Sequence, residues 1–347
     1  MRKWRFVAPV SVLLAVVAVA ATVVSSGAAA PSTRGAGYSA GLVSDVGRFN
    51  DKGFNQLQLV GLKFAAKQIS GLQTTAVESH SAGDYLPNFA TLARKGVQII
   101  IGAGYLLANQ EAQVAKQFPN TKFAITDYDV SGAPFNGKKS PNVEGLTYAT
   151  QENSYLVGCL SAMMAQKRGG DTIGVVGGVK IPPVDTFLAG YIAGAKHCVK
   201  SMKILVGYSQ DFIDQAKCKT VAQNQIDQGS VVEFNVAGPC GLGTLDAAKQ
   251  AGIWGVGVDT DQAFLGKHIL TSAVKRVDRG VYLAIKGAMG GTFNGGSNLT
   301  FNLKNNGVGL GKISKAVPAS YLKKITALRK LIVTGKIKPP LQVPKGY

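Results

Sequence analysis

From Tyr38 onwards, the chain alternates short apolar, β-branched runs with longer segments whose apolar residues recur at helical spacing. The strand candidates of the first half are YSAGLV (38–43), TTAVES (74–79), VQIIIG (97–102), KFAIT (122–126) and VEGLTYA (143–149). The helix candidates between them are Gln56–Ile69, Tyr85–Arg94 and Ala108–Gln117. Repeated strand–helix alternation of this kind predicts a parallel sheet covered by helices on both faces.

The same alternation begins again after Ala149. Its strand candidates are TIGVVG (172–177), KILVGYS (203–209), VVEFNVA (231–237) and WGVGV (254–258), with helix candidates at Ser154–Gln166, Phe187–Val199, Asp214–Asp227 and Leu245–Ala251. A Gly/Asn-rich segment (290–311) follows, for which we expect a hairpin or a pair of edge strands, and then a terminal helix at Ala319–Leu331. The fold class is therefore α/β, with two doubly wound parallel-sheet lobes.

No low-complexity linker separates the two halves, so we expect short crossings that act as a hinge beside a cleft. Ligands of open α/β sheets bind outside the carboxyl ends of the strands. The residues that follow the strands share a carboxylate, amide and aromatic chemistry, with a single lysine. They are Asp45, Asp51, Phe54, Asn55, Tyr105, Asp127, Phe212, Gly238 of GPCGLG, Asp259 and Lys275.

This set of residue types favours a neutral ligand that has a ring and several hydroxyl groups. Aromatic faces stack on planar rings, and ionised carboxylates accept hydrogen bonds from hydroxyl and N–H donors. Facing carboxylates repel phosphates, so a nucleoside fits better than a nucleotide. Taken singly, each residue has a simpler interpretation: Asp51 or Asn55 caps a helix, Phe54 or Phe234 packs in a core, and Lys275 is solvated.

The N-terminal residues 1–30 resemble a secretory signal peptide, with a basic start, an apolar stretch and small residues for cleavage after Ala28 or Ala30. An uncleaved membrane anchor is the alternative. No cysteine ends the apolar stretch, so a lipid anchor is not indicated. Loss of three basic residues would lower the net charge from +19 to +16. This excess suggests anionic surroundings, such as lipid or a polyanionic wall, whereas export argues against nucleic acid.

Four cysteines in an exported chain predict structural disulfides: Cys159, Cys198, Cys218 and Cys240. Sequence alone leaves three pairings open, and none of the spacings is typical of a zinc site. The chain has three histidines, and none neighbours a serine or cysteine in a way that indicates catalysis. We therefore expect no enzyme activity, metal or cofactor.

Several segments resemble the basic membrane protein family, the nucleoside-type solute-binding proteins of ABC importers. The segments that carry the resemblance, in the family's order, are DVGRFNDKGFNQ, VEGLTYATQENSYLVGCLSAMM, GVVGGVKIPPVDTFLAGYIAGAK, VAGPCGLGTLDAAKQAGIWGVGVDTDQ and ILTSAVKRVD. The resemblance covers the whole mature chain. It implies a type I periplasmic-binding fold with three hinge crossings, in which residues 37–150 with about 257–285 form one lobe and 151–256 with about 286–345 the other.

The resemblance also implies roles for individual residues. Phe54 and Phe234 would be the two walls that stack on the base, and Asp127 would contact the base. The remaining site residues are a ribose-hydroxyl pair, a backbone contact and two residues that shape the site, namely Asp259 with Lys275, Gly238, and Asp51 with Asn55. Asp45, Tyr105 and Phe212 join the candidate list from their strand-end positions alone.

Given the fold that the resemblance implies, we expect the disulfides Cys218–Cys240 and Cys159–Cys198. The implied function is that of an exported, monomeric receptor that binds a nucleoside, with a purine nucleoside as the first candidate, and delivers it to ABC-transporter permease subunits. The receptor would lie at the cell surface or in the periplasm, attached to the plasma membrane through its partner or its N-terminal segment. The alternatives are another small polar ligand (a sugar or an autoinducer-like polyol), an exported nucleoside-processing enzyme, and a basic protein that binds wall polyanions.

Overall fold

The computed structural model describes Met1 and residues 37–347, so the predicted signal peptide lies outside the described residues. The first sheet has the strand order β11-β5-β4-β3-β1-β2, and all its strand pairs are parallel. Its strands are β1 (Ser39–Ser44), β2 (Gln73–Val77), β3 (Ile99–Ala103), β4 (Lys122–Thr126), β5 (Val143–Tyr148) and β11 (Asn298–Phe301). Its helices are α1 (Phe54–Gln68), α2 (Tyr85–Arg94), α3 (Ala108–Gln117) and α8 (Val277–Gly290).

The second sheet repeats this order as β12-β10-β9-β8-β6-β7. Its strands are β6 (Thr172–Gly177), β7 (Lys203–Tyr208), β8 (Ser230–Val236), β9 (Trp254–Asp259), β10 (Ile269–Lys275) and β12 (Val308–Leu310), and only the β10–β12 pair is antiparallel. Its helices are α4 (Thr150–Lys167), α5 (Pro182–Cys198), α6 (Gln215–Asp227), α7 (Gly241–Gln250) and α9 (Ala319–Val333). Short 3₁₀ helices are η1 (Ala82–Asp84), η2 (Tyr105–Leu107), η3 (Gly137–Lys139), η4 (Gly238–Cys240) and η5 (Ala263–Leu265).

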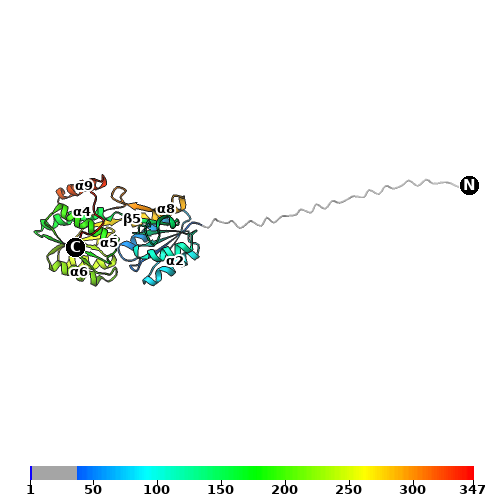
Figure 1. Cartoon of the computed structure of the whole chain (residues 1–347), viewed down its shortest axis with the longest axis horizontal. Coiled ribbons are helices and arrows are strands. Elements are labelled where there is room, and N and C mark those ends of the chain that lie inside the picture. The colour runs from blue at the N-terminus through cyan, green and yellow to red at the C-terminus, as the bar shows by residue number, and fades with distance from the viewer. Residues whose placement is uncertain (2–36) are drawn as a thin grey trace. The chain divides into compact units, whose positions relative to one another are not determined.

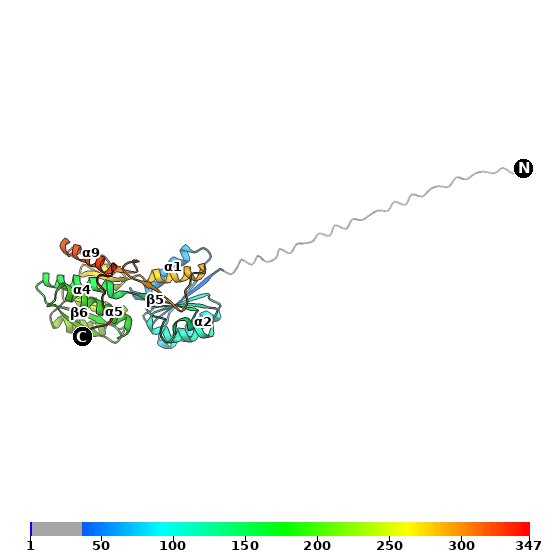
Figure 2. The same cartoon turned by 45° about the horizontal axis from the view of Figure 1, so that its top comes forward.

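The two sheets define two lobes, as predicted. Figures 1 and 2 show α2 and α8 with the first lobe, and α4, α5, α6 and α9 with the second. Alternate residues of β3 serve opposite faces of the first sheet: Ile100 packs in a cluster with Phe89 of α2, whereas Ile99 and Ile101 belong to the other cluster, with Leu62 of α1. A strand buried on both faces is continuously apolar, which explains the run IIIGA.

The chain crosses between the lobes three times. It passes from β5 to α4, from β10 to α8 and from β11 to β12. The first two crossings have the same backbone conformation, because the residue before the helix has φ −77° and ψ 62° at Ala149, and φ −80° and ψ 61° at Arg276. Backbone hydrogen bonds tie both to the third crossing, from Ala149 N to Phe301 O (2.8 Å) and from Arg276 N to Gly307 O (2.9 Å).

Two sequence-based expectations differ from the structure, and a third is narrowed to one of its alternatives. The sequence assigns residues 257–285 to the first lobe, but β9 and β10 lie in the second sheet, and the chain returns to the first lobe only at α8. Helix α8 was not predicted from the sequence, although its buried residues Val277, Val281 and Ala284 recur at helical spacing. Of the two alternatives expected for segment 290–311, the structure has edge strands rather than a hairpin: β11 and β12 lie at the edges of different sheets, because the third crossing lies between them.

Both expected disulfides are formed. Cys159–Cys198 joins α4 to the end of α5, and Cys218–Cys240 joins α6 to η4. Helices α4 and α5 pack closely because glycine stands at their contact: a Cβ at Gly158 would collide with the carbonyl of Tyr191. The second disulfide holds the loop after β8, where Gly238 has a left-handed φ of 55°.

Each lobe contains a buried carboxyl group that finds no partner within residues 37–347. They are Glu111 of α3 and Glu233 of β8. Burial raises the pKa of Glu233 to about 8. Gly174 leaves room for this carboxyl beside Gln225, whose Oε1 also lacks a donor among the described residues. An ionised Glu233 carboxylate beside Gln225 Oε1 would bring two hydrogen-bond acceptors together. A protonated Glu233 instead has an O–H group that can donate.

We expect Glu233→Gln to change how stability depends on pH. The folded pKa lies above the unfolded value, so Glu233 lowers the free energy of unfolding progressively as pH rises from about 4.5 to about 8. The variant should therefore gain up to a few kcal/mol over the wild type across this range, measured by urea denaturation at pH 5, 7 and 9. Asp227→Asn, an exposed carboxylate on α6, is the control and should show no such trend. A difference between Glu233→Gln and wild type that is independent of pH would contradict a protonated Glu233.

Candidate functional site

The loops that follow the parallel strands of the two lobes line a cavity between the lobes. In both sheets the chain order reverses beside the first strand of the lobe, and ligands bind α/β sheets at such a switch point. The lobes approach closely around the cavity, since a Cβ at Gly47 would lie 3.6 Å from the ring of Pro239 in the opposite lobe.

Asp51 organises the loop between β1 and α1. Its side chain accepts hydrogen bonds from three backbone N–H groups at the start of α1, those of Gly53 (2.9 Å), Asn55 (2.7 Å) and Gln56 (3.0 Å). These bonds replace the intrahelical partners that the first turn lacks. Burial raises the pKa of Asp51, and the three N–H groups partly oppose this effect. The capping interpretation of Asp51 is therefore correct, and the cap fixes where Phe54 enters the cavity.

Asn55 links Asp51 to a second carboxylate. Its Nδ2 donates to Asp45 Oδ1 (2.7 Å) and, at 3.2 Å, to Asp51 Oδ2. Gly47 N also donates to Asp45 Oδ1 (2.8 Å), and a side chain at Gly47 would intrude on the Asp45–Asn55 hydrogen bond. Burial raises the pKa of Asp45 to about 6, helped by the nearby negative charges of Asp51 and Asp127.

Lys275 bridges the two lobes with its ammonium group. At the end of β10, it donates to Asp127 Oδ2 of the first lobe (2.8 Å) and lies 3.2 Å from Asp259 Oδ1 of the second. All three side chains are less than a tenth exposed. Burial opposes the charged form of Lys275, but the two carboxylates outweigh it and raise the pKa of Lys275. Burial also raises the pKa of Asp259 to about 6; Lys275 opposes this rise, and the nearby negative charge of Asp127 adds to it.

Asp127 and Asp259 occupy equivalent positions in the two lobes. Asp127 follows β4 and Asp259 ends β9, the corresponding strand of the second sheet. Both have a left-handed backbone, with φ 64° and 62°. Non-glycine residues adopt this conformation at a cost, and such residues cluster at functional sites. In this backbone conformation, the carboxylates of Asp127 and Asp259 both contact the ammonium of Lys275.

Aromatic rings from both lobes surround the charged groups. The ring centroid of Phe54 lies 4.6 Å from Lys275 Nζ, and that of Phe187 from the opposite lobe lies 5.3 Å from it. Tyr105 also lines the cavity and stacks on Tyr128 with centroids 4.9 Å apart. The ring centroid of Tyr148 lies 5.8 Å from the same ammonium, which is thereby surrounded by two carboxylates and three rings, a favourable arrangement for a desolvated cation.

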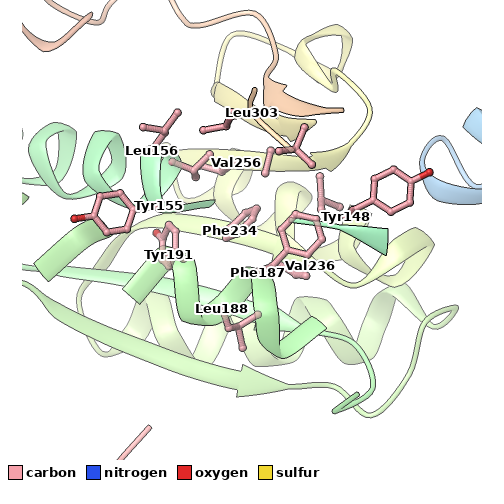
Figure 3. Close-up of a cluster of buried hydrophobic side chains, with 14 of the residues drawn as sticks. Tyr148, Tyr155, Leu156, Phe187, Leu188, Tyr191, Phe234, Val236, Val256 and Leu303 are labelled. Carbon is pink, nitrogen blue, oxygen red and sulfur yellow. The ribbon is translucent and has the colours of Figure 1, made fainter. Parts of the chain in front are cut away.

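Phe234 does not line the cavity, so its predicted stacking role is wrong. Its side chain is fully buried in the core of the second lobe, with ring centroids 5.1 Å from Tyr191 and 6.3 Å from Phe187 (Figure 3). Phe234 instead supports Phe187, which reaches the cavity from α5. The simpler interpretation of Phe234 as a core residue is therefore correct.

Phe187 and its neighbours were missed by the strand-end argument. Ile181, Pro183 and Val184 also line the cavity from the start of α5. The apolar pattern predicts a helix that begins at Phe187, but α5 begins at Pro182, because proline is well suited to the first helical turn. The dipeptide PP was the sequence signal that could have predicted the start of α5, and with it the position of these side chains just beyond the end of β6.

The other ten predicted site residues all line this cavity: Asp45, Asp51, Phe54, Asn55, Tyr105, Asp127, Phe212, Gly238, Asp259 and Lys275. Apolar surface comes from both lobes as well, including Leu106, Val236 and Val258. Within residues 37–347, we find no group of histidine, cysteine and acidic side chains that could hold a metal ion. Over the same residues, no helix has the length and apolar character needed to cross a bilayer.

Two α/β lobes, three crossings and a cavity lined by both lobes form the type I periplasmic-binding fold. The family model described as "ABC transporter substrate-binding protein PnrA-like" (Bmp) matches residues 39–342. The chain therefore belongs to the Bmp family of ABC-transporter substrate-binding proteins, as the sequence motifs indicated. The family is one of solute-binding proteins rather than enzymes.

Individual relatives agree with this assignment. The ABC transporter nucleoside-binding protein BmpA of Lactococcus lactis is 32% identical, and the alignment covers 97% of this chain and 99% of that protein. Basic membrane protein A1 of Borrelia garinii is 33% identical over 85% of this chain and 86% of its own length. Among solved structures, a solute-binding protein of an ABC transporter system from Aeropyrum pernix superposes with a TM-score of 0.76 at 25% identity, covering 87% of this chain and 94% of that one.

We expect Lys275→Met to be strongly destabilising at neutral pH, because it leaves Asp127 and Asp259 buried without a counter-ion. Breaking a buried ion pair in this way costs about 3–5 kcal/mol, which urea denaturation at pH 7 would measure. The deficit should shrink at pH 5, because burial raises the pKa of Asp259 to about 6 and acidification removes its uncompensated charge. Lys219→Met, which breaks an exposed ion pair with Asp246 (2.8 Å), should cost less than about 1 kcal/mol. Equal losses, or a deficit that grows on acidification, would contradict the role of Lys275.

Proposed function

We propose that the protein is an exported receptor that binds a nucleoside between its two lobes and delivers it to the permease of an ABC importer. The observation that carries this proposal is the pairing of Phe54 and Phe187, from opposite lobes, beside the Asp127–Lys275–Asp259 group. Together they offer ring faces and hydroxyl-binding groups within one cavity. A purine nucleoside is the first candidate, because it presents a large flat base and several hydroxyl groups.

The base would lie against the aromatic faces. Phe54 comes from the first turn of α1 and Phe187 from α5, so each lobe supplies one ring. Stacking of a base on an aromatic side chain is worth about 1–3 kcal/mol. Because the two rings belong to different lobes, a base between them would be held fully only when the lobes are together.

The polar groups fit a neutral ligand rather than a nucleotide. Asp259 Oδ1 is buried and, apart from its ion pair with Lys275, accepts no well-directed hydrogen bond from the residues that the structure describes. A ligand hydroxyl group would satisfy it, while Lys275 could donate to an oxygen of the same ligand. Asp45 and Asp51 add carboxylate oxygens to the lining and would repel a phosphate. Hydrogen-bond acceptors outnumber donors among the polar side chains that line the cavity, so the site favours a ligand with several hydroxyl or N–H donors.

The relatives support both the ligand class and the location. The Lactococcus relative is named a nucleoside-binding protein, and a relative from Pyrococcus horikoshii, 33% identical, is named a lipoprotein. Substrate-binding proteins of importers act outside the cytoplasm, which agrees with the signal-like residues 1–30 and with the two disulfides. Ligand binding would favour the closed arrangement, because only that arrangement offers contacts from both lobes.

We expect Phe54→Ala to weaken nucleoside binding at least tenfold, since it removes one stacking face. Titration calorimetry with adenosine, guanosine, inosine and uridine measures the change. The matched control is Phe49→Ala, a partly buried phenylalanine in the same loop that does not line the cavity and should bind normally. Equal affinity for Phe54→Ala and wild type would place the ligand elsewhere. A wild-type protein that binds sugars or polyols but no nucleoside would keep the receptor function and reject the ligand class.

A further inference from the structure

A second hollow lies on the same loops that line the ligand cavity. We call it the closure groove and define it by its lining residues. They are Lys52, Gly53, Gln56, Leu57, Val60, Thr260 and Phe264. Those up to Val60 belong to the first lobe, whereas Thr260 and Phe264 follow β9 in the second. The groove therefore exists only while the lobes are together.

The closure groove carries exposed apolar side chains where a solvated surface would be polar. Phe264 is 62% exposed and Val60 48% exposed. Phe64, one helical turn beyond Val60 on α1, is 47% exposed, and its ring meets that of Tyr282 edge-on with centroids 5.0 Å apart. Exposed apolar side chains that gather at one place mark interaction sites.

Lys52 lines the groove, and further basic side chains belong to the same two segments, with Asp261 beside Thr260 as the exposed acidic residue among them. Helix α1 contains Lys63 and Lys67 and no acidic residue, and Lys52 precedes it. Lys267 follows η5 in the second lobe and is exposed. A partner that fills the groove should therefore present an apolar side chain between carboxylates, because complementary charge guides docking and fixes orientation.

The closure groove and the ligand cavity share two chain segments. In the first segment Asp51 and Phe54 line the cavity, while Lys52 and Gly53 between them line the groove. In the second, Asp259 lines the cavity and Thr260, the next residue, lines the groove. Lys52 has a left-handed φ of 54°, and it lines the groove whereas the preceding residue, Asp51, lines the cavity. Any ligand that orders these segments orders both surfaces at once.

A hydrogen bond between the two lobes connects the segments that line the closure groove. Gln262 Nε2 donates to Lys52 O (3.3 Å), and the same side chain accepts from Val258 N (3.1 Å) through Oε1. Gln262 is almost fully buried, so it holds the groove segments of both lobes together. Separation of the lobes would break this bond and divide the closure groove in two.

We propose that the closure groove is the docking site for the extracytoplasmic face of the importer's permease, and that its apolar side chains engage only the closed receptor. The proposal rests on the proposed delivery function. The occupant is a permease segment with an apolar side chain flanked by acidic residues. A receptor that delivers its ligand needs a surface that distinguishes closed from open, and the closure groove is built from both lobes beside the ligand-binding segments.

The test replaces exposed apolar residues without touching the cavity. Phe264→Ser and Val60→Ser are compared with Leu322→Ser on α9, an exposed leucine (38%) remote from the groove by its position in the fold. In source-organism cells that lack the native chain, each variant is scored by uptake of radiolabelled adenosine and guanosine. We expect Phe264→Ser to lower uptake about tenfold or more, as for an interface anchor, while calorimetric nucleoside affinity and Leu322→Ser uptake stay at wild-type levels.

Photo-crosslinking separates failure of this proposal from failure of the proposed function. Benzoylphenylalanine placed at position Phe264 should capture a permease subunit of an ABC importer in intact cells, more strongly with ligand present, and at position Leu322 it should not. Capture of a second copy of the chain, or of lipid alone, would overturn the proposal, as would normal uptake by Phe264→Ser. If wild-type cells take up no nucleoside yet the permease is captured, the ligand class is wrong and the docking site stands.

Discussion

The ion pairs of Lys275 with Asp127 and Asp259 are the interaction on which the rest of the site depends. One ammonium pairs with a carboxylate from each lobe, in a place where all three charges are removed from water. Each of these residues follows or ends a strand, so the sheets themselves fix the positions of the charges. The rings of Phe54 and Phe187 then close around the ammonium from both sides. A small rotation of either lobe would separate opposite charges in a poorly solvated cavity, which makes the relative position of the lobes sensitive to what the cavity holds.

Much of the fold and of the site could be predicted because both follow from strand ends. The carboxyl ends of parallel strands meet at one edge, so Asp45, Asp127 and Asp259 could be grouped from the order of strands and loops along the chain. Helix starts were less predictable: α5 contributes Phe187 because its first turn begins five residues earlier than the apolar pattern suggested. Phe234 was misplaced for a different reason. Side chains of a buried strand alternate between its two faces, and sequence does not say which face meets the cavity.

The lobe boundaries could not be predicted from the sequence, because the amino-acid composition does not change where the chain crosses between the lobes. The passage from β10 to α8 uses ordinary residues, and no glycine- or proline-rich linker announces it. The disulfide pairing, by contrast, followed once the fold was expected. Cys218–Cys240 fastens the loop that carries Gly238 and Pro239 to the cavity wall, so a covalent bond of the second lobe also stabilises one side of the ligand site.

The two lobes repeat one strand order, and the repeat has a consequence for charge. Asp127 and Asp259 are equivalent, and the neighbouring strands β5 and β10 end at equivalent residues, Tyr148 and Lys275, just before crossings of matching conformation. Two identical units facing each other would have to carry the same residue at both places, either two lysines or none. Joining the units in one polypeptide removes that restriction. A single lysine can then be placed against two carboxylates, leaving the opposite position to a ring, so the pocket gains an asymmetry that no symmetric pair of subunits could offer to its ligand.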